Sequence, residues 1–238
     1  MKLSKRLETV ASMVTKGNRA ADVGCDHGFV PIFLVKSGIS PLAVAADVRP
    51  GPLSRAKEHI KEHRLEEKIQ TRLSDGLANI KPGEADSLIM SGIGGILMMR
   101  LLQDEEHTAK SFKELILSPQ SELFDVRRYL VSNGYLIEYE HMLCDEGKYY
   151  FIFHVLVKKD EREWSEEEYR YGKDICKDDM KTFLAYLEKE ERQYEQILEK
   201  MKQAPENDRA AQRIAQLHQD ITCLKKRRQL VYDCGCFA

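Results

Sequence analysis

The residues best suited to chemistry lie in the stretch 20–28 and at Asp47. Small apolar residues at 20, 21 and 23 predict the end of a buried strand, and Gly24 and Gly28 then supply a turn where a main chain can approach another molecule closely. Asp47 ends a second apolar run, about 20 residues beyond Gly24. A carboxylate there can accept hydrogen bonds from both hydroxyls of a ribose held by the first turn. The pattern predicts a cradle the size of a nucleoside.

Carboxylates crowd this turn and indicate the charge of the ligand. A dinucleotide fingerprint G-x-G-x-x-G that began at Gly24 would need glycines where Asp26 and Phe29 stand. A pyrophosphate requires free N–H groups and tolerates a nearby carboxylate poorly. Asp22 and Asp26 instead favour a cationic ligand. S-adenosylmethionine fits, because it carries an ammonium, a sulfonium and a ribose but no phosphate.

Two of these residues are candidates for a catalytic role. Asp22 can contact the ammonium of the ligand or accept a proton late in the reaction, and His27 can act as a general base. Each also has a structural interpretation of similar weight. Asp22 and Asp26 can simply bond turn amides, and His27 can serve as a lid or pack against the cofactor.

The elements that must position these residues alternate between strands and helices. Strands are predicted at 20–23, 42–46, 69–73, 86–90, 115–117, 135–142 and 149–157, with a five-residue hairpin loop at 144–148 before the last of them. Helices are predicted from Ser4, at 29–37, from Pro50 to about His63, from Ile96 and from Ser121 to Asn133. This order predicts an α/β fold, a doubly wound, seven-stranded Rossmann-like sheet with one antiparallel strand.

In such a sheet a ligand lies beyond the carboxyl ends of the strands, at the switch point of the strand order. Asp22, Asp47, Asp75 and the stretch 90–92 all fall at predicted strand ends. Asp75 can accept the adenine amino group, and Gly76 lets the backbone pass close to that ring. The predicted cofactor site comprises Asp22, Gly24, Asp26, His27, Gly28, Asp47, Asp75, Gly76, Met90, Ser91 and Gly92.

From Glu161 onward the composition changes, and two runs of apolar residues repeat in steps of 4 and 3. The predicted break at 204–208 separates them, so they predict an antiparallel coiled-coil hairpin that follows the α/β part. Glu191 and Arg228 occupy seam positions. We therefore expect two units, a methyltransferase domain at 1–160 and a helical arm at 161–238.

Composition bears on whether the protein binds nucleic acid, a membrane or a metal ion. The net charge is −2, so bulk charge gives no support for nucleic-acid binding, and clusters near Lys5 and Lys225 can equally be solvated helix faces. No apolar run reaches the roughly 20 residues of a membrane span. Six cysteines include one close pair, Cys234 and Cys236, and no second pair, so we expect no metal site. We expect a cytoplasmic monomer, although nothing in the sequence fixes the oligomeric state.

The motifs together resemble a known family. The glycine turn with Asp47 resembles the first two motifs of class I methyltransferases. Nearly the whole chain resembles the bacterial tRNA adenine-22 N1-methyltransferase family. The stretches that carry this resemblance are A-D-V-G-C-D-H-G at 21–28, D-V-R-P-G-P-L at 47–53, S-D-G-L at 74–77, M-S-G-I-G-G at 90–95 and S-P-Q-S at 118–121.

This resemblance implies S-adenosylmethionine as donor, tRNA as substrate and 1-methyladenosine as product. The loop from Ser91 also lacks the Asn-Pro-Pro-Tyr-like motif of exocyclic-amine methyltransferases, which favours a ring nitrogen as acceptor. Extrusion of the target base costs a few kcal/mol, which contacts elsewhere must offset. We expect the tRNA to contact Lys5, Arg6, Ile93, Gly94, Lys225 and Arg228.

Three alternatives remain open at this point. The same cradle can serve a methyltransferase that acts on a small molecule or a protein. A degenerate, non-catalytic interaction module is a second alternative, against which the intact Asp22, Gly24, Asp47 and Asp75 count. A dinucleotide oxidoreductase is the most distant, because the glycine spacing is wrong for it.

Overall fold

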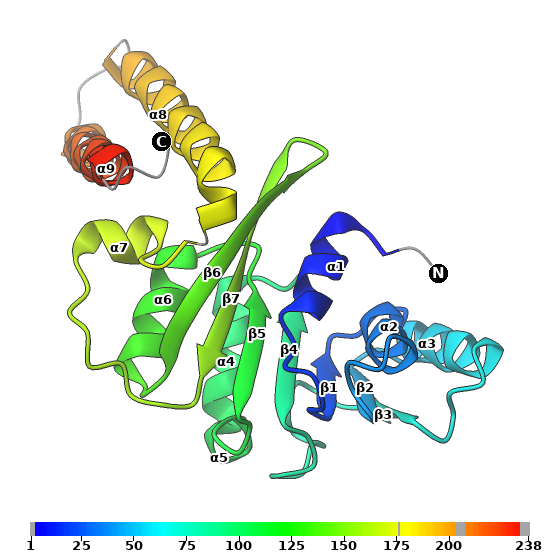
Figure 1. Cartoon of the computed structure of the whole chain (residues 1–238). Helices are drawn as coiled ribbons and strands as arrows, with labels where there is room; N and C mark the ends of the chain where they lie inside the picture. Colours follow the sequence, from blue (N-terminus) through cyan, green and yellow to red (C-terminus); the bar gives the residue numbers. More distant parts are fainter. Residues whose placement is uncertain (1–2, 176, 203–207, 234–238) are drawn as a thin grey trace.

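The structure is a computed structural model that describes residues 3–175, 177–202 and 208–233. One seven-stranded sheet runs through it in the order β3-β2-β1-β4-β5-β7-β6 (Figure 1). The first five strands are parallel, and β7 pairs antiparallel with both β5 and β6. The predicted doubly wound sheet with one antiparallel strand is confirmed. The strands are β1 (Ala20–Val23), β2 (Ala43–Asp47), β3 (Ile69–Leu73), β4 (Ser87–Ser91), β5 (Glu114–Ser118), β6 (Leu136–Asp145) and β7 (Lys148–Leu156).

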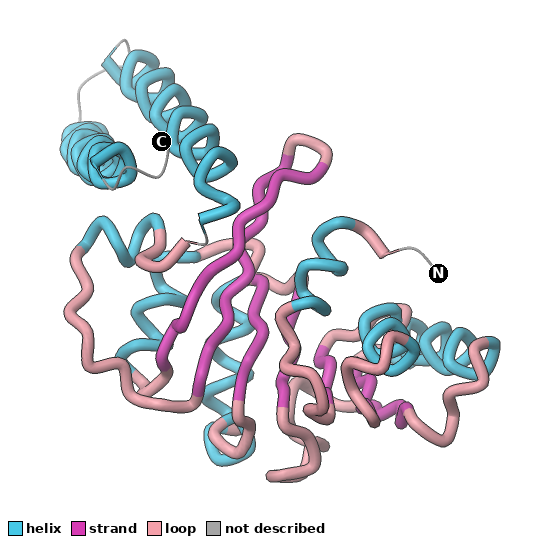
Figure 2. The backbone as a smooth tube through the Cα atoms, in the orientation of Figure 1, coloured by secondary structure: helices cyan, strands magenta, loops and turns pink. Residues whose placement is uncertain are grey.

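Helices cover both faces of this sheet, so its central strands have no solvated face. Every residue of β1, β2 and β5 is buried, as expected of parallel strands between two layers. One core cluster joins the sheet to α1 (Lys5–Ser12), α2 (Phe29–Lys36) and α3 (Pro50–Glu62), and a second joins it to α4 (Gly95–Asp104), α5 (Glu106–Ala109) and α6 (Leu123–Ser132). Figure 2 shows helices on both sides of the strands. Because β1 to β5 are parallel, their carboxyl ends lie at the same end of the sheet.

Local signals explain where most elements begin and end. The Ser4 hydroxyl accepts a hydrogen bond from the Leu7 amide at the start of α1, and Pro50 occupies the first turn of α3. The hairpin is tighter than the predicted five-residue loop at 144–148. Asp145 pairs directly with Lys148, and Glu146 and Gly147 both have positive φ. A two-residue turn of this kind matches the twist of the flanking strands, so β6 and β7 continue to its edge.

The C-terminal part forms α7 (Glu166–Tyr171), the short 3-10 helix η1 (Lys177–Asp179), α8 (Met180–Lys202) and α9 (Asp208–Asp233). Helices α8 and α9 pack together as predicted (Figure 1). The predicted break at 204–208 lies outside the described residues except for Asp208, which begins α9, and Cys234 and Cys236 also lie outside them. The sequence prediction missed α7, although Ser165 and Glu168 form a capping box at its start.

The base of the α8–α9 pair is part of the main core. Phe183 of α8 and Leu224 of α9 belong to the same buried cluster as the strands, whereas Leu198 and Leu217 form a small separate cluster nearer the tip. Residues on both sides of position 160 therefore share one apolar core. No described helix combines the length and the apolar character needed to cross a bilayer.

A buried polar network fastens the N-terminal segment to the amino ends of the strands. Glu114 of β5 is 2% exposed and accepts hydrogen bonds from Ser87, from the Thr15 amide and hydroxyl, and from Asn18, and it lies 3.0 Å from His154 Nε2. Burial alone would raise the pKa of Glu114, but these hydrogen bonds outweigh it and lower the pKa to about 2.

This network predicts how stability depends on acid. The folded pKa of Glu114 lies below the ordinary value of 4.5, so its stabilising effect is complete above pH 4.5 and is lost as the pH falls toward 2. We expect Glu114→Gln to reduce the free energy of unfolding by roughly 3 kcal/mol at pH 7 and by far less near pH 3. Urea unfolding at several pH values measures this. The exposed Glu58→Gln is the control, and an equal loss at both pH values would contradict the assignment.

Candidate functional site

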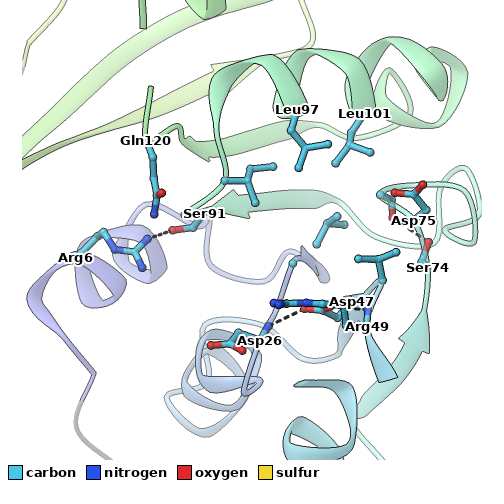
Figure 3. Close-up of a pocket in the computed structure, with 16 residues that line it drawn as sticks. Arg6, Asp26, Asp47, Arg49, Ser74, Asp75, Ser91, Leu97, Leu101 and Gln120 are labelled. Atoms are coloured by element: carbon cyan, nitrogen blue, oxygen red, sulfur yellow. Dashed lines mark hydrogen bonds and ion pairs between the residues drawn. The ribbon is translucent and has the colours of Figure 1, made fainter. Parts of the chain in front are cut away.

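A cavity of about 440 Å³ opens at the carboxyl ends of the parallel strands. It lies where the strand order reverses, between β1 and β4, which is the usual ligand position in such sheets. Figure 3 shows side chains converging on it from α1, from the strand ends and from α4. Its walls are formed by Arg6, Val23, Gly24, Asp26, Asp47, Val48, Arg49, Ser74, Asp75, Gly76, Ser91, Gly92, Ile93, Leu97, Leu101 and Gln120.

The turn after β1 can adopt its shape only because glycines stand at two places. Gly24 has φ +81° and Gly28 has φ +72°, in the region that favours glycine. At Gly28 a Cβ atom would also come within 3.0 Å of the Ala56 Cβ atom, so this glycine lets the turn pack against α3. Gly24 faces the cavity and Gly28 supports the turn from behind.

Asp47 ties the second strand to this turn. Its carboxylate is buried and accepts hydrogen bonds from the Asp26 amide at 3.3 Å and the Arg49 amide at 2.9 Å (Figure 3). The carboxylate is therefore held rigidly at the cavity wall. A carboxylate fixed in this way is suited to accept hydrogen bonds from two vicinal hydroxyls.

The third wall comes from the segment after β3. The Ser74 hydroxyl donates to the Gly76 carbonyl at 2.9 Å and accepts from the Asn79 amide at 3.0 Å, which fixes the loop that carries Asp75. Gly76 has φ +56°, and a Cβ atom there would come within 2.4 Å of a Leu101 methyl carbon. Gly76 therefore packs directly against Leu101, and this contact fixes the loop after β3 against α4.

Asp22 is buried at the end of β1, directly behind the cavity. Burial is the main cause that raises its pKa to about 7, the charge of Asp47 adds to the effect, and Arg6 opposes it. A carboxyl group with this pKa changes its ionisation near neutral pH. Perturbed pKa values of this kind are frequent in functional sites.

Arg6 reaches the cavity from a distant part of the sequence. Its guanidinium donates to the Ser91 hydroxyl and lies 5.5 Å from the centre of the Tyr150 ring (Figure 3). The Gln120 amide and the Arg6 guanidinium both lie beside Gly92, at 3.6 and 3.5 Å from the position of a Cβ atom there. Helix α1 thereby closes one side of the site with a positive charge.

The structure places the predicted site residues in three groups. Those that line the cavity are Arg6, Gly24, Asp26, Asp47, Asp75, Gly76, Ser91, Gly92 and Ile93. Asp22, Gly28 and Met90 are buried and do not line the cavity, and neither does Gly94, where a Cβ atom would come within 3.3 Å of the Ser121 hydroxyl. Lys5 lies exposed on α1, and Lys225 and Arg228 lie on α9, where both pair with Glu191.

His27 also lies outside the cavity wall. Its ring stacks on Phe29 at 5.2 Å and on His59 at 5.8 Å, and its backbone carbonyl lies 3.0 Å from His59 Nδ1. The three rings form a short stack beside the glycine turn that follows β1. The structure thus places His27 in an aromatic stack beside the cavity and not among the residues that line it.

Sequence reasoning missed seven of the lining residues, which are Val23, Val48, Arg49, Ser74, Leu97, Leu101 and Gln120. Five of them adjoin predicted site residues or motifs, so proximity was an available signal. Leu97 and Leu101 are spaced i and i+4 on α4 and so share one helix face. Nothing in the local sequence indicates that this face turns toward the cavity.

Among the described residues, no group of three His, Cys, Asp or Glu side chains is arranged to hold a metal ion. The cavity presents three carboxylates, two guanidinium groups and several apolar side chains. It combines a place for a ribose at Asp47, an apolar wall formed by Val48, Leu97 and Leu101, and acidic groups near the glycine turn.

Comparison with known proteins gives the following matches. Residues 3–153 match the family model described as "Methyltransferase domain". The chain is 28% identical over 232 residues to the tRNA (adenine(22)-N(1))-methyltransferase of Bacillus subtilis, covering 95% of this chain and 97% of that protein. The crystal structure of the B. subtilis m1A22 tRNA methyltransferase TrmK superposes with a TM-score of 0.85, covering 95% of this chain and 99% of that chain. TrmK of M. capricolum, solved with S-adenosyl-homocysteine, is 25% identical with a TM-score of 0.84, covering 97% and 100%.

Proposed function

We propose, from the premise that the chain belongs to the methyltransferase domain family, that it methylates N1 of adenine 22 in tRNA. S-adenosylmethionine would donate the methyl group, and 1-methyladenosine would be the product. The likeness to the B. subtilis enzyme along 97% of that protein carries this proposal. The acid-lined cavity at the switch point supports it independently.

The residues of the cavity fit the donor. Asp47 would hold the ribose hydroxyls, and Asp75 would accept the adenine amino group. Val48, Leu97 and Leu101 would cover the faces of that ring, since these apolar side chains line the cavity. Asp22 and Asp26 would lie toward the cationic end. Gly24 and Gly76 remove side chains from the places where the backbone must come closest.

The chemistry requires positioning more than proton transfer. The bound donor supplies a methyl group activated by the sulfonium, and adenine N1 already owns the lone pair that attacks it. The chain must align the two partners and exclude water, which is worth about 7–11 kcal/mol of the barrier in well-oriented reactions. Arg6, Ser91 and Gln120 line the side of the cavity that would receive the acceptor.

Asp22 would act on charge. Methylation at N1 leaves positive charge on the adenine ring, and a carboxylate fixed nearby in a buried site stabilises that charge strongly. Asp22 is ionised above its pKa of about 7. It would therefore serve as electrostatic support, and as an acceptor for a proton that leaves the product.

The direct test is to incubate the protein with unmodified tRNA and S-adenosylmethionine, digest the RNA and identify the modified nucleoside by mass. We expect 1-methyladenosine, and none on a transcript with guanosine at position 22. A modified base of another kind, or no methylation of tRNA, would refute the proposal. Labelled donor with lysate protein and small metabolites then tests the alternative, a methyltransferase for proteins or small molecules.

Asp47 provides a prediction for donor binding. We expect Asp47→Ala to weaken binding of S-adenosylmethionine by about 100-fold, because a ribose clamp with two charge-assisted hydrogen bonds is lost. Calorimetry measures the affinity, and circular dichroism checks the fold. The exposed Asp104→Ala on α4 is the control. An affinity of Asp47→Ala within about threefold of the wild type would contradict the assigned role.

We also propose that the α8–α9 pair grips the tRNA, with Lys5, Lys225 and Arg228 near the phosphate backbone. Arg228 and Lys225 both pair with Glu191, Lys225 at 3.4 Å. The Lys225 side chain is 53% exposed and can still reach a phosphate. The division into units at 1–160 and 161–238 remains a prediction. A charge reversal is a sharper test than a deletion, since the base of this helix pair belongs to the main core.

Lys225→Glu should therefore raise the KM for tRNA by roughly fivefold at low salt, with the affinity for S-adenosylmethionine unchanged. The matched control is Lys61→Glu on α3, far from the helix pair in sequence and equally exposed. Equal tRNA kinetics for wild type and Lys225→Glu would remove Lys225 from the interface. The proposed substrate further implies action in the cytoplasm, where tRNA resides, and we propose a monomer.

A further inference from the structure

A second cavity, of about 330 Å³, lies beside the first and shares Gln120 with it. It is enclosed by the start of α6, by α7 and by the middle of α8, so it exists only because the C-terminal helices fold back on the sheet. Its walls are formed by Gln120, Ser121, Glu122, Leu123, Phe124, Arg170, Tyr171, Tyr186, Glu190 and Tyr194.

Four of these lining side chains are aromatic. Phe124 lies 5.1 Å from the Arg170 guanidinium, and Tyr186 packs edge-on against Phe151 at 5.2 Å. Arg170 is itself balanced by Glu166 at 2.9 Å and Asp220 at 2.8 Å. The wall therefore offers ring faces and edges without an uncompensated positive charge. Such a surface suits a flat, uncharged aromatic group rather than a phosphate.

This wall holds two carboxylates, the exposed Glu122 and the half-buried Glu190. Glu190 accepts a hydrogen bond from the Tyr194 hydroxyl, and Tyr194 also bonds Tyr171. Within the described ranges no lysine, arginine or histidine forms an ion pair with Glu190. Its neighbour Glu191, by contrast, pairs with both Lys225 and Arg228. Burial raises the pKa of Glu190 above its ordinary value. Its remaining acceptor positions are available to N–H donors of a ligand.

We propose that this cavity binds an unpaired nucleobase of the tRNA next to the methylated adenine, with an N–H edge of that base donating to Glu190. The inference rests on the proposed function, which places the target adenine at the first cavity. Because the two cavities share Gln120 as a common wall, neighbouring nucleotides of one strand can occupy them together. Aromatic walls with polar groups at their edge are typical of sites for splayed single-stranded bases.

The test uses the full chain with Glu190→Gln, which keeps the shape of the side chain but replaces one carboxylate oxygen by an amide. We expect the KM for tRNA to rise about tenfold, with unchanged affinity for S-adenosylmethionine and unchanged kcat at saturation. Glu195→Gln, an exposed position on the same helix, should leave the KM within about twofold. Tyr194→Phe, which removes the hydroxyl that orients Glu190, should show a smaller rise in the same direction.

Transcripts with single substitutions at the nucleotides flanking adenine 22 identify the base. On one of these transcripts the KM of the wild type should rise about tenfold, and the KM of Glu190→Gln should not rise further on that transcript. A wild-type KM for Glu190→Gln, or losses that multiply fully on every transcript, would overturn the inference. If the wild type binds S-adenosylmethionine yet methylates no tRNA, the proposed function itself fails. If the wild type methylates tRNA and Glu190→Gln has the same KM for tRNA, only the proposed second site is refuted.

Discussion

Asp22→Asn is expected to reduce methyl transfer by more than about 100-fold while making the folded protein more stable at pH 8. Both effects follow from one property. The Asp22 carboxyl group is buried beside Asp47, and its pKa is raised to about 7. At pH 8 the wild type must keep this carboxylate ionised in a place that penalises charge, whereas asparagine is neutral and almost the same size.

The pH dependence has a definite sign. The folded pKa of about 7 lies above the ordinary value of 3.8, so the stability contribution of Asp22 is complete below pH 3.8 and is lost as the pH rises to 7. The difference in unfolding free energy between Asp22→Asn and wild type should be near zero at pH 4 and should approach about 4 kcal/mol at pH 8. Thermal unfolding at these two pH values measures it.

Activity and ligand affinity provide the second measurement. A cationic donor favours the ionised form of Asp22, so its binding to the wild type should release a proton near pH 7 and should strengthen from pH 6 to pH 8. Calorimetry in buffers of different ionisation enthalpy detects that proton. Asp104→Asn on α4, whose side chain is 61% exposed, is the control and should change neither stability nor proton release. Equal stabilisation of Asp22→Asn at pH 4 and pH 8 would refute the explanation.

Arg127→Met is expected to lower the unfolding free energy by about 3–5 kcal/mol, because it leaves the Glu140 carboxylate buried without a partner. Arg127 and Glu140 are both fully buried, and two guanidinium nitrogens of Arg127 bond the carboxylate at 2.7–3.2 Å. The guanidinium also lies over the rings of Phe151 and Phe153 and donates to the carbonyls of α7 residues 169 and 170.

The double variant Arg127→Met/Glu140→Leu separates charge from packing. Removing both charges should recover at least about half of the loss, since an apolar pair of similar volume can replace a buried ion pair. The remainder reflects the two α7 carbonyls that lose their donor. Urea unfolding at pH 7 measures all three variants. A loss below about 1 kcal/mol for Arg127→Met would show that the pair does not fasten α7 to the sheet.

The positions of the strands and of their acidic ends were predictable because the signals are local. Short apolar runs such as 43–46 and 115–117, alternating with helical patterns, are typical of buried parallel strands, and the connection rules then bring Asp22, Asp47 and Asp75 to the same end of the sheet. The heptad steps similarly predicted α8 and α9. Each of these inferences needs only neighbouring residues and a general rule of topology.

The sequence by itself thus determined the doubly wound seven-stranded sheet, the end of that sheet at which the acidic residues gather, and the helical pair at the C-terminus. Only the tertiary structure decided that Arg6 meets Ser91, that Gln120 divides two cavities, that Arg127 pairs with Glu140 and that the base of α8 and α9 joins the main core. These contacts join residues far apart in the chain. They depend on which face of each helix covers which strand and on how deeply a charge is buried. The spacing of apolar residues in the sequence indicates neither of these.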